Sequence, residues 1–96
     1  MRINLKLFPP LSDTARTAEL PVELEDAATL GTIIDHLVNR YGPGMKQHFF
    51  DDRGRIIPSW AFFVNRKIVP FNQPGALAVA VAAGDEVSII LNIAGG

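Results

Sequence analysis

The segment from residue 30 to residue 41 has a clear helical pattern that limits how the rest of the chain can fold. Apolar residues recur there three or four positions apart and form one stripe along a helix: Leu30, Ile33, Ile34, Leu37, Val38 and Tyr41. Thr29 is a suitable N-cap, and Gly42-Pro43 is a strong stop signal. The opposite side of the helix is polar. The sequence therefore predicts one main helix that buries a single face.

Alternating and apolar runs on both sides of this helix predict strands. Pro21 lacks a backbone N–H, which places its strand at a sheet edge. Asn65-Arg66 favours a tight turn, because Asn tolerates a positive φ. The predicted strands are residues 2–7, 20–24, 60–64, 67–69 and 87–91.

The order of these elements indicates an α+β fold. A β-β-α-β-β-β order predicts a mixed sheet of four to five strands with one main helix packed on one face. We expect a loop at residues 11–17 and a short helical turn at residues 45–50. A chain of 96 residues fits one domain, here residues 1–91, followed by a flexible C-terminal tail at residues 92–96.

Composition excludes several classes of protein. Nine Lys and Arg residues against ten Asp and Glu residues argue against a nucleic-acid binder. The absence of cysteine excludes disulfides, thiolate metal sites and iron–sulfur clusters. The most apolar stretch, residues 76–93, is broken by Gly84-Asp85-Glu86 and does not fit a membrane-spanning helix. With no apolar leader near Met1, we expect a cytoplasmic protein without a membrane partner.

No group of residues predicts a self-contained active site. His36 and His48 have no second group at catalytic or metal-ligand spacing, so we expect His36 to be solvated on the polar face of the helix and His48 to lie in a loop. Asp51-Asp52 is typical of a turn, and we expect no metal site. The basic residues favour contact with an acidic partner surface: Arg53, Arg55, Arg66 and Lys67. We therefore expect a protein that is not itself an enzyme.

The end of the chain has a different pattern. Gly95 and Gly96 offer no side chain to bury, but they make a thin peptide that lets a carboxylate enter a narrow site. Residues 92–96 could extend about 15–18 Å from the domain. The alternative is an ordinary frayed terminus. The glycines alone do not separate these two interpretations.

Several features together resemble the MoaD/ThiS family, whose members are ubiquitin-like β-grasp sulfur carriers. These features are the element order, Gly84-Asp85-Glu86-Val87 before the last strand, and the terminal Ile93-Ala94-Gly95-Gly96. Phe63-Val64-Asn65-Arg66-Lys67 is similar to the family's strand and turn. The length and the insert from Gly42 to Pro58 resemble those of molybdopterin synthase small subunits. The resemblance covers nearly the whole chain but assigns no role to Phe8-Pro9-Pro10.

The resemblance implies a reaction at the C-terminus. The Gly96 carboxylate would be adenylated by ATP on an E1-like adenylyltransferase, and a sulfur donor would then displace AMP and leave a thiocarboxylate. In molybdopterin biosynthesis, the large subunit of the synthase would receive the tail and pass the sulfur to a pterin precursor. ATP and its metal ion would be bound by the activating partner, so no cofactor is expected on this chain.

The resemblance also implies roles for single residues. Gly96 would supply the reactive carboxyl group, Gly95 would keep the tail narrow, and Ile93 and Ala94 would guide it into a partner's channel. Ordering such a tail costs backbone entropy, so additional apolar surface on the sheet would have to bind the partner. The candidates for this surface are Phe8, Phe62 and Ile90, although the apolar run around Phe62 favours a core position for that residue.

Three other functions share these features. The activated Gly96 could be captured by a lysine, as in a ubiquitin-like modifier. The chain could carry sulfur for thiamine or another pathway. It could also be a β-grasp interaction module whose tail is inert.

Overall fold

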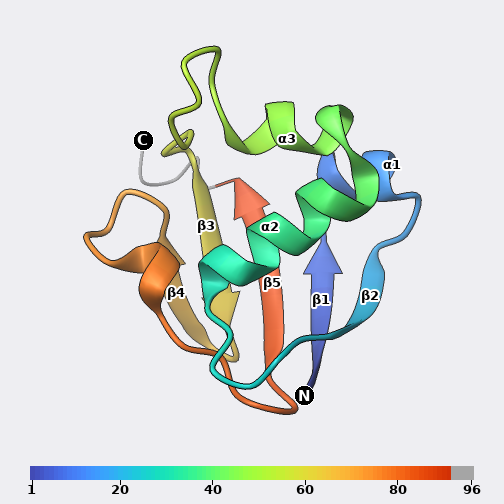
Figure 1. Cartoon of the computed structure of the whole chain (residues 1–96), viewed down its shortest axis with the longest axis vertical. Helices are drawn as coiled ribbons and strands as arrows, with labels where there is room; N and C mark the ends of the chain where they lie inside the picture. Colours follow the sequence, from blue (N-terminus) through green and yellow to red (C-terminus); the bar gives the residue numbers. More distant parts are fainter. Residues whose placement is uncertain (92–96) are drawn as a thin grey trace.

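The computed structural model describes residues 1–91, which form a mixed sheet covered on one face by helices (Figure 1). The strand order is β2-β1-β5-β3-β4. β1 and β5 run parallel, and the other neighbouring strands run antiparallel. The five strands are β1 (Arg2–Leu7), β2 (Glu19–Glu23), β3 (Trp60–Val64), β4 (Lys67–Pro70) and β5 (Glu86–Leu91). The predicted α+β fold is confirmed, and β2 lies at the expected sheet edge.

The main helix, α2 (Leu30–Tyr41), has the predicted bounds because both of its ends are capped. The hydroxyl of Thr29 accepts a hydrogen bond from the Thr32 backbone N–H at 3.3 Å, and the Thr32 hydroxyl accepts one from the Thr29 N–H at 3.0 Å. This reciprocal pair satisfies two backbone donors of the first turn. Gly42 ends the helix with a φ of 77°, a conformation that glycine adopts without strain.

The core lies between α2 and the sheet. The buried residues of α2 belong to one cluster with the inward side chains of all five strands. A group of aromatic rings fills the part of the core that α3 (Pro43–Phe49) covers; its members are Phe49, Trp60, Phe62 and Phe71. The largest inward side chains are Ile3, Leu5, Leu7, Phe49, Phe62 and Ile89, all nearly inaccessible to solvent.

Two short helices cover the end of the sheet where β1 and β5 finish (Figure 1). The expectation of a loop at residues 11–17 is wrong, because Leu11–Ala15 form the helix α1 and bury Leu11 and Ala15. Five residues are too few to show a helical period, so the sequence carried no signal for α1. The predicted helical turn near residues 45–50 is confirmed as α3, which begins two residues earlier at Pro43.

The connection from β4 to β5 covers residues 71–85. A single 3₁₀ turn, η1 (Ala76–Ala78), lies between β4 and β5 and contacts the start of α2. Among residues 1–91, no helix has the length and hydropathy needed to cross a lipid bilayer.

Candidate functional site

The C-terminal segment follows a central strand of the sheet. β5 lies between β1 and β3, and its last residue, Leu91, is also the last residue that the structure describes (Figure 1). Four of the residues predicted to function lie outside the described part of the chain: Ile93, Ala94, Gly95 and Gly96. The structure therefore places the residue from which this segment starts, Leu91, beside Trp60 of β3.

Two sequence features that resembled the family meet at the opposite end of β5. The Asn65 side chain accepts a hydrogen bond from the Glu86 N–H at 3.1 Å and donates one to the Asp85 carboxylate at 3.2 Å. Asn65 has a φ of 56°, as the predicted turn requires. The other carboxylate oxygen of Asp85 accepts from the Ala82 N–H at 2.8 Å. These contacts fix the start of β5 and have a structural role.

The sheet has an open face on the side away from the helices, and apolar side chains gather on part of it. Phe63 and Ile68 are paired across β3 and β4 and are 36% and 43% exposed. Ile90 of β5 is half-buried on the same face, and Phe8, which directly follows β1, is 46% exposed. We call these four residues the open-face patch: Phe8, Phe63, Ile68 and Ile90.

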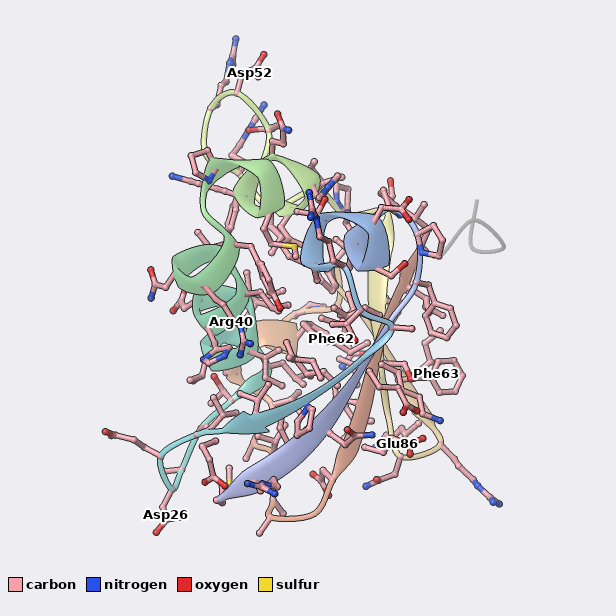
Figure 2. The ribbon with its side chains drawn as sticks, turned by 90° about the vertical axis from the view of Figure 1, so that its right-hand side faces the viewer. Asp26, Arg40, Asp52, Phe62, Phe63 and Glu86 are labelled. Atoms are coloured by element: carbon pink, nitrogen blue, oxygen red, sulfur yellow. The ribbon has the colours of Figure 1, made fainter. Side chains whose placement is uncertain are left out.

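Phe62 is not part of the exposed surface for which it was a candidate, and it occupies the core position that its apolar run favoured. Phe62 is fully buried and its ring stacks on that of Phe71, with centroids 4.6 Å apart. Figure 2 shows Phe62 pointing into the layer between sheet and helices, whereas its neighbour Phe63 points outward. Successive residues of a strand point to opposite faces, so only one of the two can be exposed. Phe8 is exposed, as predicted, and Ile90 is half-buried.

The remainder of the open face is polar. Lys6 and Glu86 form an ion pair at 3.2 Å, and Arg2 pairs with Glu23 at 3.1 Å. Both pairs are largely exposed, so each contributes little to stability. The open face therefore has a charged half on β2 and β1 and an apolar half on β3, β4 and the end of β5. The apolar half reaches the end of β5 at Ile90; Leu91 is 42% exposed but alternates onto the opposite face, which it shares with its pairing partner Trp60.

The expectations for the two histidines are met only in part, because His48 lies in α3 and His36 has a buried ring nitrogen. His48 shares a hydrogen bond of 2.8 Å with the Thr14 hydroxyl, which links α3 to α1. Burial, followed by the nearby charge of Arg40, lowers the pKa of His36. Its Nε2 atom is buried and has no hydrogen-bond partner among the described residues.

Asp51 forms a turn, as predicted. Its carboxylate accepts hydrogen bonds from the backbone N–H groups of Arg53 and Arg55, both at 2.9 Å. The N–H of Arg55 is the largest cause that lowers the pKa of Asp51. Within residues 1–91, no three His, Asp or Glu side chains are grouped so that they could hold a metal ion.

Sequence reasoning missed Phe63, Ile68 and Leu91 as exposed apolar residues. A signal was present in the predicted turn. A two-residue turn at Asn65-Arg66 pairs the residues on either side of it, and the next pair outward is Phe63 with Ile68, so these two side chains must share a face of the sheet. The sequence could not show which face this is, because the run of residues 60–64 is apolar at every position.

Comparison with known proteins agrees with this geometry. The model of the ThiS family matches residues 5–96. Small archaeal modifier protein 1 of Haloferax volcanii is 29% identical over 91 residues, which cover 95% of this chain and 97% of that protein. The crystal structure of SAMP1 from the same organism superposes with a TM-score of 0.79 at 28% identity, and each chain is covered completely.

A further similar structure comes from a complex. One chain of the BexX/CysO complex of Amycolatopsis orientalis is 26% identical to this protein, with a TM-score of 0.68 and coverage of 98% of this chain and 99% of that one. The ubiquitin-like β-grasp fold implied by the sequence is thus confirmed. Because the family model matches nearly the whole chain, this protein belongs to the ThiS family.

Proposed function

We propose that this protein is a small carrier that is activated at the Gly96 carboxyl group by an E1-like adenylyltransferase and then loaded with sulfur as a thiocarboxylate. The observation that carries the proposal is the family match, which extends through the terminal Gly95-Gly96. The geometry supports it, because the segment that bears these glycines follows β5 beside an exposed apolar surface.

The proposed chemistry needs no catalytic side chain on this protein. A Gly96 carboxylate oxygen attacks the α-phosphorus of ATP, and pyrophosphate leaves. A sulfur nucleophile then attacks the acyl carbon, and AMP leaves with the electrons of the broken C–O bond. ATP and its metal ion are bound by the activating enzyme. The protein therefore acts as a co-substrate.

The open-face patch is the proposed docking surface for the activating enzyme. Ordering the five residues after Leu91 costs roughly 5–10 kcal/mol of backbone entropy. At about 25 cal/mol per Å², offsetting this cost requires burial of about 200–400 Å² of apolar surface, before the other costs of association. The apolar half of the sheet lies next to the end of β5, so one partner can contact the patch and the C-terminal segment together.

The proposed sulfur acceptor is the pterin precursor of the molybdenum or tungsten cofactor, in which case the second partner is the large subunit of molybdopterin synthase. The basis for this assignment is the resemblance of the sequence to the small subunit of that synthase. Thiamine synthesis and other thiolation reactions use the same carrier chemistry and are the alternative acceptors within this proposal.

Conjugation to other proteins is the second candidate function. It is favoured by the similarity to a relative named as a modifier protein, 29% identical across 95% of this chain. In this reaction a lysine amine, instead of sulfur, attacks the adenylated Gly96 and forms an isopeptide bond. Because AMP leaves in both reactions, the activation step is shared and the product distinguishes them.

The first test is the intact mass of the untagged protein purified from its own host. One oxygen-to-sulfur exchange that maps to Gly96 is the expected result. A variant with one residue added after Gly96 should keep the fold and lose adenylation; normal activation of that variant would refute the proposal.

The test for conjugation must use a suitable protease. The last basic residue is Lys67, so trypsin would leave residues 68–96 on the modified lysine, a remnant that searches for Gly-Gly would miss. Cleavage after Glu86 leaves only residues 87–96. Finding this remnant on lysines of other proteins would favour the modifier function, and finding the thiocarboxylate without it would favour the sulfur carrier.

A further inference from the structure

The two sides of β5 hold its last residues differently. On the β1 side, the pairing ends at Leu7 with Ile89. On the β3 side, it continues for two more residues, through Ala61 with Ile90 to Trp60 with Leu91. In the described chain, the end of β5 is therefore held in the sheet by β3 alone.

The segment Phe8-Pro9-Pro10, to which the family resemblance assigned no role, explains this asymmetry. Neither proline has a backbone N–H to donate to β5. The carbonyl oxygen of Phe8 is already used, since it accepts hydrogen bonds from the N–H groups of Leu11 and Ser12 at 2.8 and 3.2 Å. The chain beyond β1 thus turns into α1 and leaves the last two residues of β5 without a partner on that side.

On the other side, Trp60 fastens the start of β3 to the helical layer. Its indole N–H donates a hydrogen bond of 2.7 Å to the carbonyl oxygen of His48 in the last turn of α3. Carbonyls in the last turn of a helix lack a partner within the helix, so this bond satisfies one of them. The ring of Trp60 also packs on Phe49, with centroids 5.6 Å apart, and its backbone carbonyl accepts from the Phe71 N–H at 3.0 Å.

From this geometry we infer that Trp60 is a positioning residue for the reaction at the C-terminus. This inference rests on the proposed function. Trp60 fastens the start of β3, the strand segment that pairs with Ile90 and Leu91. In this way it fixes the point from which the reactive segment starts. Trp60 touches neither the reacting carboxyl group nor ATP in this scheme, because it acts through the β3–β5 pairs.

Loss of this anchor should slow the reaction more than it weakens docking. If Leu91 separates from the sheet, one more residue must be ordered each time the segment enters a partner. That entropy cost corresponds to a roughly 5- to 30-fold loss in rate for each residue released. The open-face patch is unchanged, so binding through the patch should persist.

The test compares Trp60→Phe with Phe71→Leu. Trp60→Phe keeps an aromatic ring and removes the indole N–H, whereas Phe71→Leu perturbs the same aromatic group and leaves the indole bond to His48 intact. Two quantities are measured for each variant: amide hydrogen exchange of residues 89–91 relative to residues 3–7, and the kcat and KM of ATP–pyrophosphate exchange with the E1-like adenylyltransferase of the same organism.

We expect Trp60→Phe alone to speed exchange at the end of β5 and to lower kcat about 5- to 30-fold, with KM changed by less than about twofold. Unchanged exchange, or an equal loss of kcat in Phe71→Leu, would overturn the inference. If the wild-type protein is not adenylated, the proposed function fails, while the exchange comparison still decides whether Trp60 anchors β5. Trp60→Tyr replaces Trp60→Phe if the latter does not fold.

Discussion

Phe62 and Phe63 are neighbours of identical chemistry that the fold places in opposite environments. Phe62 is fully buried and stacked on Phe71, and Phe63 is 36% exposed on the open face beside Ile68. Replacing each by alanine should therefore separate the contribution of the core from that of the proposed docking surface. The pair forms a matched experiment, since both side chains come from the same strand.

The two variants should lose free energy of unfolding by amounts that differ severalfold. Phe62→Ala removes a buried ring and leaves a cavity, which costs about 3–5 kcal/mol. For a domain of this size, each kcal/mol lowers Tm by roughly 4–8 °C, so the loss is roughly 12–40 °C. Phe63→Ala removes a half-exposed ring and its cross-strand contact with Ile68, which costs about 0.5–1 kcal/mol.

Urea denaturation followed by the fluorescence of Trp60, the single tryptophan, measures both losses. The reverse order should hold for activation: Phe63→Ala should raise the KM of the activating enzyme for this protein, because the proposed docking surface is smaller. Equal losses of stability in the two variants would refute the assignment of faces. A KM unchanged in Phe63→Ala would refute the docking surface and leave the fold intact.

Three further predictions concern the fold. Asn65→Ala removes two side-chain hydrogen bonds and replaces a residue that tolerates positive φ by one that does not, so it should cost about 1–3 kcal/mol in urea denaturation. Asn65→Gly should cost less, because glycine adopts this φ without strain and only the hydrogen bonds are lost. Burial first, and the charge of Arg40 second, lower the pKa of His36 from 6.5, so below about that pH the unfolded chain takes up a proton that the folded state resists. The free energy of unfolding should therefore decrease as the pH is lowered through this range, and it should decrease less in His36→Gln. Thr29→Ala removes the cap that accepts from the Thr32 N–H and should lower the free energy of unfolding by about 0.5–2 kcal/mol; an unchanged urea midpoint would contradict the role of the capping box.

The main helix was predictable because it is long and its ends have chemical signals. Twelve residues from Leu30 to Tyr41 show more than three turns of periodicity, and Thr29 and Gly42 mark the boundaries. The five residues of α1 show no period and have no side-chain cap, so only tertiary packing of Leu11 and Ala15 reveals the helix. Predictability here depended on segment length and capping.

The site was less predictable than the fold for a related reason. A face can be read from a strand only when polar and apolar residues alternate, as they do in β1. In β3, apolar residues occupy both faces, because one face packs on the helices and the other carries part of the open-face patch. The apolar residues of the proposed docking surface therefore removed the alternation that would have separated Phe62 from Phe63.

The two edge strands of the sheet, β2 and β4, are protected against pairing with a strand of another protein. An exposed strand edge invites pairing with another chain, and proteins protect such edges with proline, charge or short strands. β2 has Pro21 in its centre and glutamates at both ends, and β4 has only four residues, beginning at Lys67 and ending at Pro70. Both edges of the sheet are thus unfavourable for strand addition.

The open face of the sheet, in contrast, exposes the apolar side chains of Phe63 and Ile68 to solvent. The ion pair of Lys6 and Glu86 lies on the charged part of the same face. A partner that bound by adding a strand would be specified mainly by backbone hydrogen bonds. A partner that binds this face would be specified by side chains, and the β5 residue that it would contact there is Ile90, next to the last residue of the strand. Under the proposed function, the fold would then couple recognition of the sheet to presentation of the C-terminal segment.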